Sequence, residues 1–185
     1  METQGKNSFV ERLSGAASLN PAIYREVGLD ITATWPALMV VLGTSIVAGI
    51  VVLLGNPEIA FISVIYSIIG NLIGWVVWAS VIYIVGTRMF VGSNAKVGFV
   101  GMIRALGFAN APQLFAFASL IPTVGQFFQI AIQLWGLSAM VVAVKQSLDL
   151  DSTFKAVGVV LLAYIPVLVL VVFVVSLTAT SIVAN

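Results

Sequence analysis

Long apolar stretches separated by short polar breaks make up most of this sequence. The stretches cover residues 35–54, 59–86, 105–120, 126–144 and 154–182. A helix rises about 1.5 Å per residue, so every stretch except the third can cross a hydrocarbon layer of roughly 30 Å without help. No alternation of apolar and polar positions indicates strands. The pattern predicts an all-α fold, a polytopic bundle of five transmembrane helices.

The first part of the chain, residues 1–32, has a different pattern. Ser8 and Glu11 have the spacing of a capping box, and apolar residues at helical spacing follow them. The Asn-Pro pair at 20–21 is typical of a second helix start. We therefore expect two short amphipathic helices in a cytoplasmic N-terminal segment, followed by a five-span domain at 33–185. The segment docks either under the bundle or against a partner.

Composition and charge settle the class and the topology that we expect. Hydrophobic residues make up 61% of the chain and charged residues 8%, which is far from a soluble domain. The basic residues fall before the first span, between the second and third, and around the break between the fourth and fifth. They are Lys6, Arg12, Arg25, Arg88, Lys96, Arg104, Lys145 and Lys155. Lys and Arg are retained on the cytoplasmic side, so five crossings place the N-terminus in the cytoplasm and the C-terminus outside.

A re-entrant third segment, which would enter and leave the membrane on the same side, is the alternative topology. That alternative would move Lys145 and Lys155 outside, whereas a crossing keeps all basic residues inside. The anchors we expect at the membrane interface are Trp35, Arg88, Arg104, Lys145 and Lys155.

The third stretch, residues 105–120, is the unusual one, because it covers roughly 24 Å as an α-helix. We expect Arg104 to reach the interface and the bilayer to thin locally. Pro112 lacks a backbone donor, which predicts a kink near Asn110 and a freed carbonyl four residues before the proline. Asn110, Gln113 or a neighbouring helix can serve that carbonyl. The functional alternative is a discontinuous helix at a transporter's binding site.

Two polar or small faces are candidate interhelical surfaces. Gln126, Gln129 and Gln133 share one face of the fourth span, and we expect them to point into the bundle and hydrogen-bond across helices. A polar pathway for a small solute is the other interpretation of this stripe. On the second span, small residues recur at three- and four-residue steps with an amide beside them, which indicates close helix packing, either internal or between copies. These residues are Ser63, Ser67, Gly70, Gly74 and Asn71.

The residue types that the sequence lacks exclude several kinds of catalytic and metal-binding site. There are no histidines and no cysteines, which excludes His-based general bases, thiol nucleophiles and His or Cys metal ligands. None of the seven acidic residues lies inside a predicted span, and Asp149 with Asp151 are typical of a solvated turn. We expect no enzyme, no catalytic residue, no cofactor, no metal and no nucleic-acid partner.

One run of the chain resembles a known family. "RALGFANAPQLFAFASLIPTVGQFFQIAIQLWGLSAMVVAVKQSLDLDSTFKAV" has an Arg-x-x-Gly-aromatic-Ala-x-x-Pro start, an Ile-Pro-x-x-Gly turn and a tryptophan helix. The matching residues are Arg104, Gly107, Phe108, Ala109, Pro112, Ile121, Pro122, Gly125 and Trp135. This pattern resembles the Yip1 family, and specifically its prokaryotic members.

The resemblance implies a five-span bundle with a cytoplasmic N-terminal segment, in a bacterial or archaeal cell membrane. Eukaryotic members are associated with vesicles between endoplasmic reticulum and Golgi and with small GTPases. This chain has "GLDITATWP" where those members have an Asp-Leu-Tyr-Gly-Pro motif, so the resemblance does not extend to small GTPase binding. The partners we expect are membrane lipids and other membrane proteins or a second copy.

Three functions are consistent with these features. The first is a non-catalytic membrane scaffold or adaptor that acts through helix packing and its N-terminal segment, in membrane organisation or a trafficking-like process. The second is a small-solute permease or channel that uses the Pro112 kink and the glutamine stripe. The third is an accessory subunit of a larger membrane complex. Replacing Gln129 and Gln133 with leucine separates a pathway, which would lose flux, from interhelical glue, which would lose stability.

Overall fold

The regular structure of this protein is helical throughout the residues that the computed structural model describes, which are 7–55, 61–91 and 95–183. Three of its helices are long and apolar enough to cross a membrane, at Ile31–Gly55, Val64–Phe90 and Gly125–Leu148. A shorter apolar helix is found at Thr153–Val169. The all-α membrane-protein class predicted from the sequence is confirmed.

The elements follow one another in a simple order. They are α1 (Phe9–Ala17), α2 (Pro21–Leu29), the short 3₁₀ turn η1 (Ile31–Ala33), α3 (Thr34–Gly55), α4 (Phe61–Gly86) with its π-helical continuation η2 (Thr87–Val91), α5 (Phe99–Phe108), the 3₁₀ helix η4 (Ala111–Leu120), α6 (Gly125–Leu148) and α7 (Thr153–Val183).

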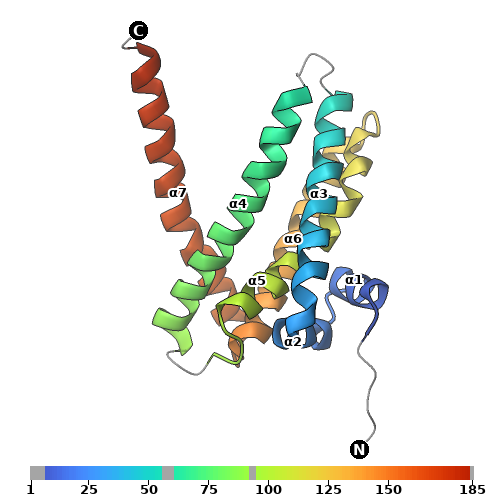
Figure 1. Cartoon of the computed structure of the whole chain (residues 1–185), viewed down its shortest axis with the longest axis vertical. Coiled ribbons are helices and arrows are strands. Elements are labelled where there is room, and N and C mark those ends of the chain that lie inside the picture. The colour runs from blue at the N-terminus through green and yellow to red at the C-terminus, as the bar shows by residue number, and fades with distance from the viewer. Residues whose placement is uncertain (1–6, 56–60, 92–94, 184–185) are drawn as a thin grey trace, which may run out of the picture.

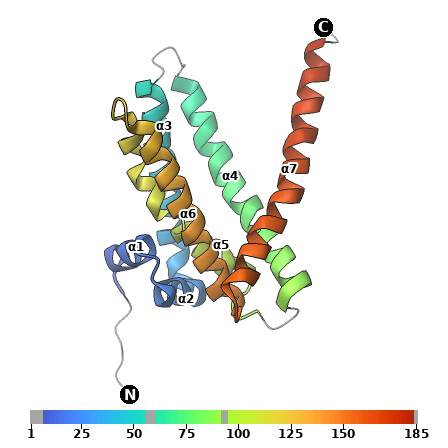
Figure 2. The same ribbon diagram turned by 180° about the vertical axis from the view of Figure 1, so that it is seen from behind.

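The helices run alternately along the long axis of the molecule. α3, the pair α5 and η4, and α7 run away from the end that holds α2, whereas α4 and α6 run back towards it (Figures 1 and 2). η4 packs against both α3 and α6, and α4 packs against α3, α5 and α7. α4 and α7 lie close near the α2 end and separate towards the other end (Figure 1).

Helix α3 shows how the apolar pattern turns into packing. Its buried residues recur at three- and four-residue steps, so they share one face. They are Ala37, Val40, Val41, Thr44, Ser45 and Gly49. The hydroxyl groups of Thr44 and Ser45 donate to the carbonyl of Val41, at 2.9 and 2.7 Å. Burial of two polar side chains is therefore tolerated, because each donor has a local acceptor.

The third apolar stretch differs from the kinked helix that the sequence predicts. α5 ends at Phe108, and the chain continues from Ala111 as a 3₁₀ helix. The side chain of Asn110 donates from Nδ2 to the carbonyl of Leu106 at 2.9 Å, which lies two residues before the Phe108 carbonyl that it was expected to serve. Because Pro112 cannot donate and Asn110 competes for a helical carbonyl, the α-helical ladder stops rather than bends.

The charged side chains come together at the end of the molecule where α1 and α2 lie. Arg25 of α2 and Lys96 both pair with Asp149, with N–O distances of 3.8 and 2.8 Å. Lys155, in the first turn of α7, pairs with Asp151 at 2.9 Å, and that contact keeps the pKa of the exposed Asp151 carboxyl below its usual value. Segments that are far apart in the sequence thus present their charges on one face.

Candidate functional site

The first two helices, residues 8–30, form a folded unit that we call the N-terminal cap. Helix α1 starts at the capping box of Ser8 and Glu11, whose two bonds measure 2.7 and 3.3 Å. The bond from the Ser8 backbone N–H holds the pKa of the Glu11 carboxyl below its usual value. Helix α2 starts where Asn20 accepts from the backbone N–H of Ala22 at 3.0 Å. Both helices therefore begin at the N-capping residues predicted from the sequence.

A buried ion-pair network joins α1 to the end of α2. Arg12 is 4% exposed, and its guanidinium lies 2.8 Å from Glu26 and 2.6 Å from Asp30. Burial alone would lower the pKa of Arg12, but hydrogen bonds to the two carboxylates outweigh it and the pKa is raised. The pair of acceptors keeps the buried charge compensated, which fixes the two helices relative to each other.

The centre of the cap is a buried tyrosine. Tyr24 donates from its hydroxyl to the carbonyl of Ala16 at 2.7 Å, and it is fully buried. Burial raises the pKa of this phenol, so it stays a protonated donor at physiological pH. Together with Arg12, this bond makes the cap one unit rather than two loosely joined helices.

Arg104 of α5 holds the cap against the bundle. Its Nε donates to the carbonyl of Val27 at 3.0 Å and its Nη2 to the carbonyl of Gly28 at 2.6 Å. A longer bond of 3.4 Å joins Nη1 to the hydroxyl of Thr34. The last carbonyls of a helix lack intrahelical donors and carry partial negative charge, so a guanidinium is a fitting partner for the end of α2.

The side chain of Arg104 does not extend outward. The residue is 6% exposed, because its side chain turns inward to the end of α2. Its burial is possible because a guanidinium has several donors in a fixed fork, and two of them meet backbone carbonyls here.

Two aromatic contacts extend the cap to the broken third segment. Trp135 of α6 donates from its indole N–H to the carbonyl of Ala17 at 2.7 Å, and its ring stacks on Phe115 of η4 with centroids 5.4 Å apart. Phe9 of α1 lies 6.5 Å from the ring of Phe108, the last residue of α5. The cap therefore touches both sides of the break.

Close backbone approach between α2 and α5 depends on glycine. A Cβ atom on Gly101 would lie 2.6 Å from the carbonyl oxygen of Gly28, a distance that real Cβ atoms do not reach. Gly107, further along α5, would meet the Cβ of Ala37 at 2.9 Å and the ring of Trp75 at 3.0 Å. These glycines, rather than the small-residue face of α4, allow close helix packing beside the cap.

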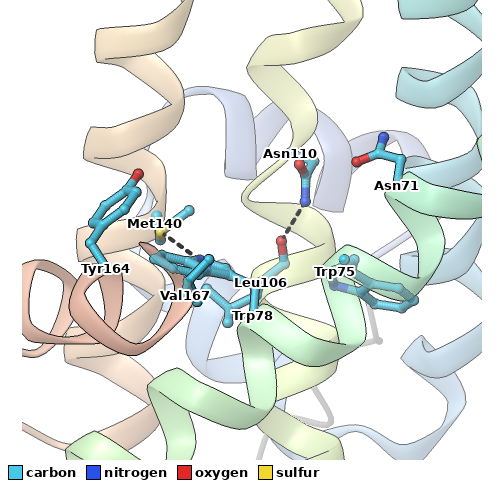
Figure 3. Close-up of a pocket in the computed structure, with 9 residues that line it drawn as sticks. Asn71, Trp75, Trp78, Leu106, Asn110, Met140, Tyr164 and Val167 are labelled. Atoms are coloured by element: carbon cyan, nitrogen blue, oxygen red, sulfur yellow. Dashed lines mark hydrogen bonds between the residues drawn. The ribbon is translucent and has the colours of Figure 1, made fainter. Parts of the chain in front are cut away.

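The largest of the cavities we describe, about 300 Å³, lies beside the break, between α4, α5, α6 and α7 (Figure 3). Its lining is mainly aromatic and aliphatic, with two amides. The residues are Asn71, Gly74, Trp75, Trp78, Leu106, Asn110, Met140, Tyr164 and Val167. The rings of Trp78 and Tyr164 pack at 4.6 Å, and the Trp78 indole N–H points to the sulfur of Met140 at 3.1 Å.

The two amides of this cavity are oriented by hydrogen bonds. Asn71 donates from Nδ2 to the hydroxyl of Ser45 at 2.7 Å, and Asn110 donates from Nδ2 to the carbonyl of Leu106. In both residues the amide nitrogen is committed to the protein. No donor within the described ranges contacts either amide oxygen.

Two smaller cavities contain the glutamines. One, about 200 Å³, is lined by Gln113, Gln129 and Gln133 together with Ser119 and residues of α3. The other, about 90 Å³, includes Gln113 and Gln133 and shares Asn110 with the large cavity. All three glutamines of the predicted stripe are exposed. Gln129 and Gln133 nevertheless line these cavities, whereas Gln126, in the first turn of α6, lines none of them.

The small-residue face of α4 is open in this structure. A Cβ atom on Gly70 or Gly74 would meet nothing within 4 Å, so no neighbouring helix uses these glycines for close approach. Ser63 and Ser67 lie on α4, and their side chains are outside the described part.

The other expected anchors occupy the ends of helices. Trp35 is 72% exposed at the start of α3, and Arg88 lies in the π-helical end of α4. Lys145 donates to the hydroxyl of Thr153 at 2.9 Å. The basic residues Lys145 and Lys155 thus both contact the turn between α6 and α7.

Sequence reasoning missed aromatic residues of the large cavity and the serine that accepts from Asn71. Ser45, Trp75 and Tyr164 lie on different helices and become neighbours of the break only through packing. Trp75 three residues before Trp78 was a signal, because residues at that spacing share a helix face. The residues next to Tyr164 in the sequence give no indication that its side chain lines a cavity.

Hydrogen bonding and apolar contact are the chemistry available here. In the described residues, no cluster of three or more His, Cys, Asp or Glu could hold a metal ion. The large cavity offers amide oxygens, indole rings and a phenol. The amide oxygens accept hydrogen bonds, whereas the phenol and the indole N–H of Trp75, which has no partner among the described residues, can donate. These groups recognise shape and single hydrogen-bonding groups.

Comparison with known proteins gives one match. A family model described as "Yip1 domain" matches residues 20–176, which is most of the chain. No curated protein and no solved structure matches the chain.

Proposed function

The chain belongs to the Yip1 family, and from this premise we propose that it is a non-catalytic integral membrane scaffold or adaptor. In this role the membrane helices hold the N-terminal cap at the cytoplasmic face, where a partner protein binds it. The process served is membrane organisation or a trafficking-like step in a bacterial or archaeal cell membrane.

We further propose that the chain crosses the membrane five times, with α5 and η4 as one crossing. The alternating direction of the helices supports this arrangement (Figure 1). The charged end supports its orientation, because Arg25, Lys96 and Lys155 lie together beside the cap, and basic residues are retained in the cytoplasm.

The anchoring of the cap is the observation that carries the proposal. Arg104 and Trp135 bind three carbonyls at the ends of α1 and α2. A surface held in one conformation before binding loses less conformational entropy when a partner docks, which raises affinity. A fixed cap on a membrane bundle is suited to recruitment.

Recruitment can be tested by purifying the tagged protein from its native membrane in mild detergent and weighing the intact complex by mass spectrometry. We expect a stoichiometric partner with the wild type and its loss in Arg104→Leu. Arg88→Leu is the matched control, because Arg88 forms no hydrogen bond or ion pair with the cap among the described residues. Retention of the partner in Arg104→Leu, or absence of any partner with the wild type, contradicts the proposal.

The topology has a separate test, because the chain has no cysteine. Thr123, in the exposed turn before α6, and Asp151, in the exposed turn before α7, are suitable for single-cysteine variants. In intact cells a membrane-impermeant thiol reagent should label Thr123→Cys and not Asp151→Cys. Labelling of Asp151→Cys from outside contradicts five crossings in this orientation.

A further inference from the structure

The large cavity faces the space where α4 and α7 separate. Gly74 and Val167 lie on the two helices at its wall, and the side of α4 at Gly74 is open, since a Cβ there would touch nothing within 4 Å. If α4 and α7 cross the bilayer as proposed above, this side of the cavity faces lipid, so a membrane-dissolved molecule can enter it without passing through water.

The lining requires a ligand that is mostly apolar. Two indole rings, a phenol ring and the side chains of Leu106, Met140 and Val167 surround the cavity. No lysine or arginine is among the lining residues, so there is no counter-charge for a phosphate headgroup. No carboxylate is among them either, so a buried ammonium group would be uncompensated. The ligand is therefore neutral.

The two amides specify the polar group of that ligand. Both use their N–H groups inside the protein, Asn71 towards Ser45 and Asn110 towards Leu106. The amide oxygens are left as acceptors, and Figure 3 shows the oxygen of Asn71 directed towards Asn110. A carbonyl oxygen in hydrocarbon needs a donor. An ether or ester, which only accepts, cannot supply one.

We propose that this cavity binds a neutral membrane alcohol. Its hydroxyl group donates to the amide oxygen of Asn71 or Asn110, and its apolar body leaves the cavity between α4 and α7. The volume of about 300 Å³ is at the small end of ligand pockets, so it holds the hydroxyl end, and the remaining chain lies along the open sides of the two helices. The proposal rests on the membrane placement given under Proposed function.

The test uses hexadecanol that carries a diazirine in its chain and a terminal alkyne. The purified full-length protein is reconstituted in phosphatidylcholine vesicles, whose lipid has no hydroxyl donor, and is irradiated with the probe. We expect crosslinks on α4 and α7 near the cavity. Unlabelled hexadecanol should compete, and hexadecyl methyl ether should compete roughly tenfold less well, because one hydrogen bond is lost.

Paired variants locate the site. Gly74→Leu adds a side chain at the cavity wall, where a Cβ meets nothing within 4 Å, and should abolish capture, whereas Gly70→Leu, one turn away in equally open space and outside the lining, should not. The double variant Asn71→Leu/Asn110→Leu should weaken capture and remove the preference for alcohol over ether, and the single variant that does the same identifies the amide that accepts the hydroxyl hydrogen. Gln126→Leu is the matched amide control, because Gln126 is exposed and lines no described cavity.

Each contrary result has a distinct meaning. Equal competition by alcohol and ether overturns the assignment of a hydroxyl donor. Equal capture in Gly74→Leu and Gly70→Leu overturns the location. Absence of capture together with a dimer that Gly74→Leu disrupts identifies a second copy of the chain as the occupant and overturns the proposal. Failure of the topology labelling contradicts only the five-span arrangement, because the same capture can be measured in detergent.

Discussion

Replacing Arg104 with leucine should release the N-terminal cap from the bundle. The substitution keeps an apolar stem of similar reach but removes the donors to the carbonyls of Val27 and Gly28, whose bonds measure 3.0 and 2.6 Å. Both carbonyls belong to the last turn of α2, where no intrahelical donor is available. They would be left buried and unpaired for as long as the cap stays docked.

The size of the effect follows from these two bonds. A hydrogen bond to a charged group is worth about 1.5 to 3 kcal/mol, and an unsatisfied buried acceptor costs about 1 to 3 kcal/mol. Because an opened cap can hydrate the carbonyls, the net change should be about 2 to 4 kcal/mol in the docking equilibrium. At 1.4 kcal/mol per factor of ten, this corresponds to a roughly 30- to 700-fold rise in the open population.

Thiol labelling measures that population directly, because the chain has no native cysteine. Val27→Cys places a thiol at a fully buried position of α2, where a small reagent reacts only after local opening. Its labelling rate should rise by the factor given above when Arg104→Leu is added. Arg104→Lys should give an intermediate rate, since one ammonium group serves one carbonyl less rigidly than the forked guanidinium serves two.

The control is Ala22→Cys, which is exposed on the same helix and should label at one rate in all backgrounds. A labelling rate of Val27→Cys that changes by less than a factor of two in Arg104→Leu refutes the role of this arginine as the clamp of the cap. Monodisperse elution in detergent and an unchanged helical circular dichroism spectrum exclude global unfolding as the cause of faster labelling.

Three further changes test neighbouring parts of the cap. Trp135→Phe keeps a ring against η4 but removes the 2.7 Å bond to the α1 carbonyl, so the buried thiol should label about 2- to 10-fold faster. Gly101→Ala should also speed labelling, because its Cβ would lie 2.6 Å from the carbonyl oxygen of Gly28 and α2 must shift; unchanged labelling would show that the helices adjust freely. Ser8→Pro should raise the pKa of Glu11 towards its ordinary value, measured by carboxyl NMR titration, because proline lacks the backbone N–H that donates to this carboxylate. The lowered pKa of Glu11 in the wild type means that its support of α1 is present above its ordinary pKa and lost as pH falls through the lowered one, and an unchanged titration in Ser8→Pro would contradict this.

The helices of this protein could be predicted from local sequence because their signals are local. Ser8 with Glu11 marks the start of α1, and Asn20 before a proline marks the start of α2. The long apolar runs give α3, α4 and α6 within a few residues. In each case a residue interacts with neighbours in its own turn, or a whole stretch avoids water, and neither depends on where other helices lie.

The site could not be predicted in the same way because its residues meet through packing. Asn71 was singled out as an amide beside small residues, but its partner Ser45 lies on another helix. Gly70 and Gly74 have the spacing of a packing face, yet a Cβ there would meet nothing within 4 Å, whereas Gly101 and Gly107, which lack that pattern, lie in close contact with neighbouring helices. Spacing shows which residues share a face, but the crossing of the helices decides which face is used.

The inward direction of the Arg104 side chain follows from where its helix begins and from the geometry of the segment after it. The apolar count suggested a helix from Ala105, which put the arginine at its end, whereas α5 begins at Phe99 and surrounds Arg104 with helix on both sides. Beyond the break, the ten residues of η4 rise about 2.0 Å each rather than 1.5 Å, which adds roughly 5 Å. The earlier start and the 3₁₀ geometry together remove the length deficit that seemed to require a snorkelling arginine. Arg104 is thereby free to turn inward, and the end of α2 supplies the carbonyls that its buried guanidinium needs.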